Sequence, residues 1–201
     1  GVPYQVLIDD WDTYYNSINI PMTQEEMDGA MRESEERYNV SHSIYGTMGG
    51  HLKFAEAIAK IDSMRIQYPT LISQKFSIGT TYEGRTIWAV RITKNPDAPT
   101  GRPQVLYHAV IHAREPVSMS SQMYYFYWLF ENYNIDPMAT YILNNREIYW
   151  IPYYNPDGHV HNETTNPNGG GNWRCNKHLT SPPSLSCGPV DLNRNYGIYA
   201  Y

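Results

Sequence analysis

The chain has 201 residues, a formal net charge of −5 and 41% hydrophobic residues, which is enough for one globular domain with a substantial core. Its acidic residues are scattered and it has no cluster of Lys and Arg, which argues against nucleic acid or an anionic membrane as a partner. The longest aromatic and apolar run, residues 123–130, is far shorter than the roughly 20 residues that a membrane-spanning helix needs.

The N-terminal third contains a strand, an acidic segment and a helix. Residues 1–10 are expected to form a short strand, and residues 22–38, rich in glutamate, a polar helix or a linker. We place a boundary between Asn39 and Gly50. After it, Phe54, Ala57 and Ile61 belong to an apolar pattern at helical spacing, and Tyr68-Pro69 ends that helix.

The rest of the chain alternates strands with a helix. Residues 74–80, 86–93 and 103–111 have strand-like patterns, and the third is nearly continuous in apolar residues, as in a strand buried on both faces. Pro116 begins a second helix, residues 146–154 predict a further strand, and residues 155–201 are expected to be rich in loops. This order predicts an α/β fold of three layers, α/β/α, around a mixed sheet.

His112 and Glu115 lie in the sequence HAREPVS, between the end of a predicted buried strand and the start of a helix. Ligands bind at this place in open α/β sheets. Zinc accepts imidazole nitrogen and carboxylate oxygen, so the pair could supply two of the three protein ligands of a catalytic zinc. Taken alone, the pair is better explained as an ordinary polar turn, because a His and a Glu three residues apart occur often by chance.

Further along the chain, separate loops supply two arginines and an amide. Arg174 follows Trp173, and Asn193 and Arg194 lie in the sequence DLNRNY. A guanidinium can bind a carboxylate through two parallel hydrogen bonds or stabilise a developing oxyanion. The simpler interpretation is that each arginine pairs on the surface with a nearby acid such as Asp191.

Two cysteines and two sequons bear on the compartment. Cys175 and Cys187 would suit a local disulfide in an oxidising environment, with two free thiols as the alternative. The triplets beginning at Asn39 and Asn162 match the N-glycosylation acceptor pattern and favour secretion in the same way.

Together these motifs resemble the zinc metallocarboxypeptidases of the carboxypeptidase A/B family. The resemblance runs from about Tyr45 to Tyr201. It rests on motifs in the same order and at similar spacing: Glu83-Gly84-Arg85, His112-x-x-Glu115, Asn155-Pro156-Asp157-Gly158, Arg174 and Asp191-x-Asn193-Arg194-Asn195. Residues 2–10 resemble the last strand of the inhibitory pro-segment that precedes many secreted members. The resemblance therefore implies that residues 1–44 are the end of a pro-segment with its connection, and that residues 45–201 are the N-terminal portion of the catalytic domain.

The resemblance also implies a role for each site residue. His112 and Glu115 would be ligands of Zn²⁺, and Arg174 would be catalytic by stabilising the tetrahedral oxyanion. Arg114 would line the pocket for the residue before the cleaved bond. Asn193 and Arg194 would bind the free C-terminal carboxylate of a peptide or protein substrate.

The chain departs from the family pattern in what it covers of the active site and at its cysteines. The family's third zinc ligand, its general base and its mobile tyrosine would all lie beyond Tyr201. We therefore expect the active site of the chain as given to be incomplete and inactive, and to bind zinc poorly. His108 lies some 13 Å from His112 along the predicted strand, which is too far to share a metal with it. His159 and His161 could approach the metal, although the family uses neither of these positions. Cys175 replaces a common lysine, and Cys187 matches a cysteine whose usual partner lies further on, so Cys187 pairs either with Cys175 or with that partner.

We therefore expect a secreted, zymogen-derived zinc carboxypeptidase that removes single C-terminal residues, with its own pro-segment as a possible inhibitor. One alternative is a catalytically inactive peptide-binding relative that keeps the carboxylate-binding residues. Another is a cytosolic member that acts on the tails of proteins, which a reduced pair of cysteines and unglycosylated asparagines would support.

Overall fold

The structure is a computed structural model, and it describes residues 3–18, 20–178 and 189–196. Its elements follow the chain in this order: α1 (Trp11–Ile18), α2 (Gln24–Tyr38), α3 (Phe54–Gln67), β1 (Phe76–Thr80), β2 (Thr86–Ile92), β3 (Gln104–His108), α4 (Val117–Glu131), α5 (Pro137–Asn145), β4 (Glu147–Ile151), α6 (Pro156–Thr165) and the 3₁₀ helix η1 (Leu192–Arg194). None of the helices in these ranges is long and apolar enough to cross a bilayer.

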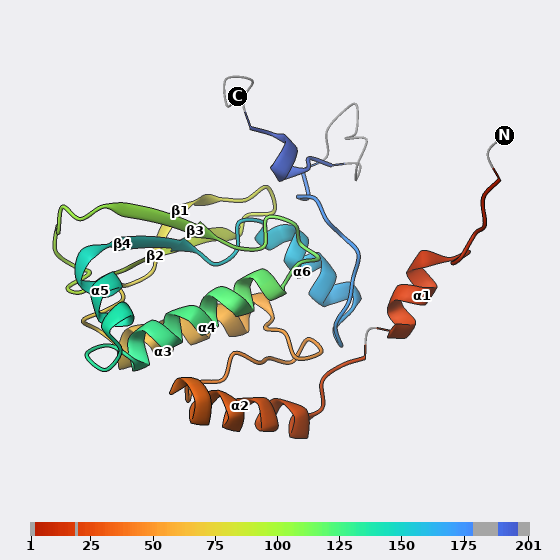
Figure 1. Cartoon of the computed structure of the whole chain (residues 1–201). Helices are drawn as coiled ribbons and strands as arrows, with labels where there is room; N and C mark the ends of the chain where they lie inside the picture. The colour runs from red at the N-terminus through yellow and green to blue at the C-terminus, as the bar shows by residue number, and fades with distance from the viewer. Residues whose placement is uncertain (1–2, 19, 179–188, 197–201) are drawn as a thin grey trace.

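A four-stranded mixed sheet organises the fold, in the order β1-β2-β4-β3. β2 pairs antiparallel with both β1 and β4, whereas β3 pairs parallel with β4. Helices α3 and α4 lie on the same face of this sheet, and α2 lies on their outer side (Figure 1). The predicted α/β class with a mixed sheet is confirmed. Within the part of the chain that the structure describes, α3 and α4 both cover the same face of the sheet.

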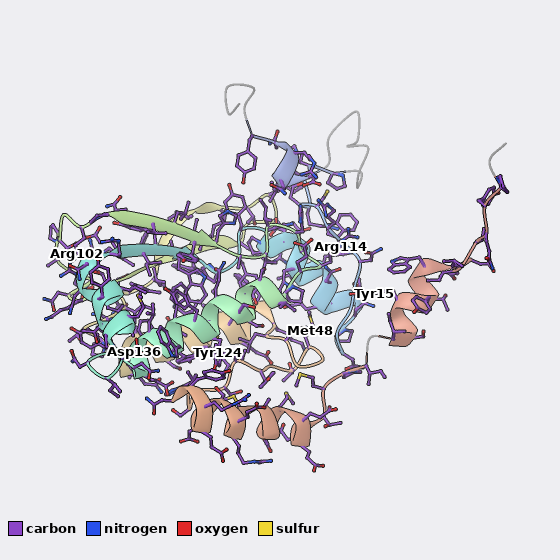
Figure 2. The ribbon with its side chains drawn as sticks, viewed as in Figure 1. Tyr15, Met48, Arg102, Arg114, Tyr124 and Asp136 are labelled. Carbon is purple, nitrogen blue, oxygen red and sulfur yellow. The ribbon has the colours of Figure 1, made fainter. Side chains whose placement is uncertain are left out.

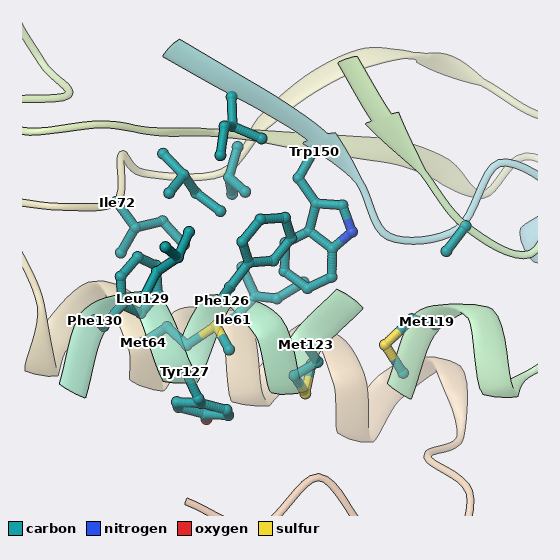
Figure 3. Close-up of a cluster of buried hydrophobic side chains, with 14 of the residues drawn as sticks. Ile61, Met64, Ile72, Met119, Met123, Phe126, Tyr127, Leu129, Phe130 and Trp150 are labelled. Carbon is teal, nitrogen blue, oxygen red and sulfur yellow. The ribbon is translucent and has the colours of Figure 1, made fainter. Parts of the chain in front are cut away.

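The core fills the space between the sheet and the helices α3 and α4 (Figure 3). Phe126 of α4 and Trp150 of β4 are both fully buried, with ring centroids 4.7 Å apart. The indole of Trp150 also donates to Gln122 Oε1 at 2.8 Å, so its polar edge is satisfied inside the core. This packing joins α4 to the sheet and thereby fixes the loop that precedes α4.

The third predicted strand, β3, is less buried than its apolar sequence predicted. β3 ends at His108 and is the last strand of the sheet, with Val105 40% and Leu106 61% exposed. Burial on both faces is therefore wrong for β3 among the described residues. It holds instead for β4, whose five residues are buried or nearly so. The apolar run continues past β3 because Ala109 and Val110 are buried in the loop that follows.

The N-terminal strand is also wrong, because residues 3–10 form no strand. A strand needs a neighbour for its backbone hydrogen bonds, and the described residues provide none there. The acidic segment is a helix: Thr23 and Glu26 form a capping box at the start of α2, and Asn39 ends it in a left-handed conformation. Ser34 Oγ donates to the Tyr124 hydroxyl of α4 at 3.1 Å, and Figure 2 shows Tyr124 on the side of α4 that faces α2.

Two helices that the sequence pattern did not predict, one of them in the stretch expected to be rich in loops, begin in the same way. Asp136 caps α5 by accepting from Met138 N and Ala139 N, and Asn155 caps α6 by accepting from Gly158 N. In both, proline follows the cap at the first helical position, where its missing N–H costs no hydrogen bond. The Asn-Pro and Asp-Pro pairs were therefore usable helix signals.

Candidate active site

His112 and Glu115 lie in the loop between β3 and α4, as predicted. The loop passes through Val110, which has a φ of 52°, an unfavourable conformation for a β-branched residue. Hydrogen bonds hold it there: Ser118 Oγ lies 3.0 Å from Val110 N, and Asn155 N donates to Val110 O at 3.1 Å. The loop is thus fixed from α4 and from the start of α6.

The two side chains face each other. His112 Nδ1 lies 3.0 Å from Glu115 Oε1 and 3.1 Å from Oε2, with the imidazole buried and the carboxylate half exposed. Two ligand atoms of one tetrahedral zinc lie roughly 3.4 Å apart, given zinc distances near 2.1 Å. The pair therefore fits two positions of a zinc site that is open on the Glu115 side. Within the described ranges, no group of three His, Cys, Asp or Glu side chains could hold a metal ion.

Asp191 supports the other side of the imidazole. Its Oδ1 lies 3.3 Å from His112 Nε2 and accepts from Asn193 N at 2.9 Å, while Oδ2 accepts from Arg174 Nε at 3.0 Å. Burial acts to raise the pKa of Asp191, but these hydrogen bonds and the charge of Arg174 outweigh it and lower the pKa below its ordinary value. A carboxylate that accepts from one ring nitrogen of a histidine orients the other nitrogen toward a metal. Here the carboxylate of Asp191 lies at Nε2, so Nδ1 would be the nitrogen that binds zinc.

The sequence did not predict this role: Asp191 stood in a family motif and as a possible surface partner of an arginine, and neither indicated a contact with His112. The local pattern indicated only that Asp191 caps η1, directly before Leu192-Asn193-Arg194. The partner, His112, is 79 positions away, so the contact itself could not be read from spacing.

Arg174 is brought to the same place. Its Nη1 lies 3.9 Å from Glu115 Oε1, in addition to the bond from Nε to Asp191. Ala113 N donates to Arg174 O at 3.0 Å, so the backbone of the arginine is joined to the HAREPVS loop. Arg114 is exposed and donates to Asn172 Oδ1 at 2.6 Å, which places it beside the loop that leads to Arg174.

Asn193 and Arg194 lie on η1 and are both exposed. Arg194 Nη1 donates to Asn193 O at 2.8 Å, and the backbone N–H of Asn193 donates to Asp191 Oδ1 at 2.9 Å. Asp191 therefore connects η1 to His112, and the predicted carboxylate-binding residues lie next to the predicted metal ligands.

The three other histidines near the motifs do not join the site. His159 is fully buried with Nε2 3.2 Å from Leu52 O, and burial lowers its pKa to about 4. His161 packs its ring 4.6 Å from that of Trp173, and the ring of His108 lies 5.2 Å from that of Tyr154.

The remaining motifs form the scaffold of the site. Asp157 is buried and accepts from Thr81 Oγ1 at 2.7 Å, Glu83 N at 2.9 Å and Arg85 Nη1 at 2.8 Å. Glu83-Gly84-Arg85 is thus the turn between β1 and β2, tied to the start of α6. Gly84 adopts a φ of 84°, which only glycine reaches without strain.

The two cysteines differ in whether the structure describes them, and the two sequons differ in exposure. Cys175 is buried, whereas Cys187 lies outside the described residues, so their pairing stays a prediction. Asn39 is exposed, but Asn162 is only 1% exposed and cannot accept a glycan in this fold.

Comparison with known proteins places these features in a family. The model of the zinc carboxypeptidase family matches residues 57–200. The zinc carboxypeptidase of Saccharothrix mutabilis subsp. capreolus is 29% identical over 148 residues, which cover 74% of this chain and 32% of that protein. Carboxypeptidase A2 of Rattus norvegicus is 27% identical over 197 residues, covering 98% of this chain and 42% of that protein.

Solved structures agree in fold. The crystal structure of thrombin activatable fibrinolysis inhibitor matches 85% of this chain and 40% of that one, with a TM-score of 0.64 at 22% identity. Carboxypeptidase A from Helicoverpa armigera matches 85% of this chain and 41% of that one, with a TM-score of 0.58 at 23% identity. The chain thus spans 32% to 42% of the length of these two curated relatives.

Proposed function

Because the chain belongs to the zinc carboxypeptidase family, we propose that it supplies two zinc ligands and the substrate-binding side chains of a metallocarboxypeptidase that removes single C-terminal residues from peptides. The observation that carries this proposal is the continuous network formed by Glu115, His112, Asp191 and Arg174. It joins the two candidate ligands to a guanidinium and, through Asp191, to η1.

Each side chain has a distinct role in this proposal. Bound zinc would supply a water of lowered pKa and polarise the substrate carbonyl. Arg174 would donate to the oxygen that becomes negative in the transition state, because its guanidinium lies next to Glu115. Asn193 and Arg194 are exposed beside it and would hold the terminal carboxylate by charge-assisted bonds, while Arg114 would contact the preceding residue.

Steady-state kinetics of the full-length protein would test these roles. Arg194→Ala should raise KM for peptides with a free C-terminus about 10- to 100-fold, since a hydrogen bond between charged groups contributes about 1.5–3 kcal/mol. Arg174→Ala should instead lower kcat with little change in KM, as expected for an interaction made mainly in the transition state.

Arg146→Ala provides the matched control, because Arg146 contacts the Tyr141 ring on α5, away from the network. Unchanged kinetics for Arg194→Ala would refute the carboxylate-binding role, and unchanged kcat for Arg174→Ala would refute the oxyanion role. Zinc content, measured by elemental analysis, should be reduced by His112→Ala and retained by Arg146→Ala.

The proposal includes residues 1–44 as the end of a pro-segment and its connection. Its support is the docking of α2 on the remainder of the fold, through Ser34 and the Tyr124 hydroxyl. Limited proteolysis within residues 20–44 of the full-length protein should then raise peptidase activity. Equal activity before and after cleavage would contradict a zymogen.

We also propose that the protein is secreted. The sequon at Asn39 is the one of the two that the structure leaves exposed. Material from a secreting host should therefore carry glycan at Asn39 and none at Asn162, as peptide mass spectrometry would measure. A peptide that is unmodified at Asn39 would remove this support.

A further inference from the structure

Asn162 makes a two-bond contact with the residue that precedes Arg174. It lies on α6, and its Nδ2 donates to Trp173 O at 2.9 Å while its Oδ1 accepts from Trp173 N at 3.0 Å. Both ends of the amide are thus used on the backbone of a single residue, 11 positions away in the chain. A buried side-chain amide with both ends satisfied fixes a segment strongly, because releasing it would leave buried polar groups unpaired.

The surrounding chain is shaped to admit this amide. A Cβ at Gly171 would lie 2.7 Å from Asn162 Oδ1, and Gly171 adopts a φ of 85°, so a side chain there would displace the amide. Trp173 is held further by its indole, which donates to Cys175 O at 2.8 Å. These contacts hold the backbone immediately before Arg174.

Arg174 itself is held from the opposite side. Its carbonyl accepts from Ala113 N at 3.0 Å and from Asn155 Nδ2 at 3.4 Å, so its backbone is fixed by the loop of His112 and the cap of α6. Without the contact at Trp173, only this side would set the direction in which the arginine side chain leaves the backbone. The guanidinium contacts with Asp191 and Glu115 depend on that direction.

We infer that Asn162 is a positioning residue for Arg174, which orients the guanidinium by fixing the backbone of Trp173. This inference rests on the proposed function, in which Arg174 stabilises the oxyanion. Asn162 is too deeply buried to touch a substrate, so its effect must pass through the arginine. A displacement of about 1 Å in a catalytic group can cost on the order of a hundredfold in rate.

The first test is Asn162→Ala in the full-length enzyme. The kcat for a peptide substrate should fall about 10- to 100-fold with KM nearly unchanged. Asn132→Ala is the matched control: Asn132 is also a buried amide that donates to backbone carbonyls, but those belong to Tyr38 and Trp128, in the contact between α2 and α4. Asn132→Ala should lower the stability but not kcat, provided that the kcat of each variant is measured well below its unfolding temperature.

The double variant Asn162→Ala with Arg174→Ala separates positioning from a general loss of structure. If Asn162 acts through Arg174, the second substitution should add little to the loss caused by Arg174→Ala alone. Multiplicative losses would overturn the inference. If Arg174→Ala has no effect on kcat, the proposed function fails instead, so the two failures are distinguishable.

Asn162→Asp covers the case in which the alanine variant does not fold. A protonated carboxylic acid can reproduce both hydrogen bonds, whereas the carboxylate repels the carbonyl of Trp173, and burial raises the pKa of such a group. The kcat of this variant relative to the wild type should therefore fall as pH rises through that pKa. A pH-independent ratio of the two kcat values would overturn the inference.

Discussion

Replacing Asp191 with alanine tests the network most directly. The substitution removes the acceptor for His112 Nε2, Arg174 Nε and Asn193 N in one step. The Asp191 side chain is 2% exposed, and those of His112 and Arg174 are 8% and 20% exposed, so little water can replace the lost contacts.

The expected loss of stability follows from this burial. Breaking one partner of a buried ion pair costs about 3–5 kcal/mol. Arg174 keeps some hydration and remains 3.9 Å from Glu115, so we expect the lower end of this range, about 3 kcal/mol. Because Asp191 also orients His112, zinc affinity should fall about 10- to 100-fold.

Urea unfolding without zinc and zinc titration would measure the two effects separately in the full-length protein. Asp97→Ala is the control, because Asp97 also contacts an arginine, Arg65, at 2.8 Å, but its side chain is 58% exposed. An exposed pair contributes less than about 1 kcal/mol. If Asp191→Ala destabilises no more than Asp97→Ala, the buried network contributes no stability. If zinc affinity is unchanged, Asp191 does not orient His112.

Three other expectations concern parts of the fold away from the candidate zinc site. His159 has a pKa of about 4 in the folded state and near 6.5 in the unfolded state, so the unfolded state binds more protons between these pH values. Acidification from pH 7 therefore lowers the free energy of unfolding by up to about 3 kcal/mol. Urea titrations at pH 7 and 4.5 should show a smaller loss of stability for His159→Phe than for the wild type. Asp157→Ala should cost about 3 kcal/mol, because Arg85 would lose its buried partner, and an unfolding midpoint equal to that of the wild type would contradict this. Glu131→Ala removes the acceptor for Ser41 N and Ser41 Oγ and the partner of His42 Nδ1, so trypsin should cleave after Arg37 faster than in the wild type.

The fold elements that could be predicted are those that depend on neighbouring residues. The apolar spacing from Phe54 to Ile61 predicted α3, and the alternation in residues 74–93 predicted β1 and β2, because side-chain period and backbone conformation are linked within one element. The position of His112 and Glu115 between a strand and a helix was likewise local. The pattern could not show that β3 lies at the edge of the sheet, since strand order is set by pairing between distant segments.

The amino-acid sequence by itself determined which chemical groups this protein has and the order in which they occur: the candidate ligands, the arginines, the asparagine and their family. Only the tertiary structure decided what each group contacts. Asp191 changed from a surface acid to the support of His112, and Asn162 from a glycosylation sequon to a buried contact of Trp173. The physical reason is that both contacts are made between separate segments, and their geometry exists only when the sheet and helices have packed together.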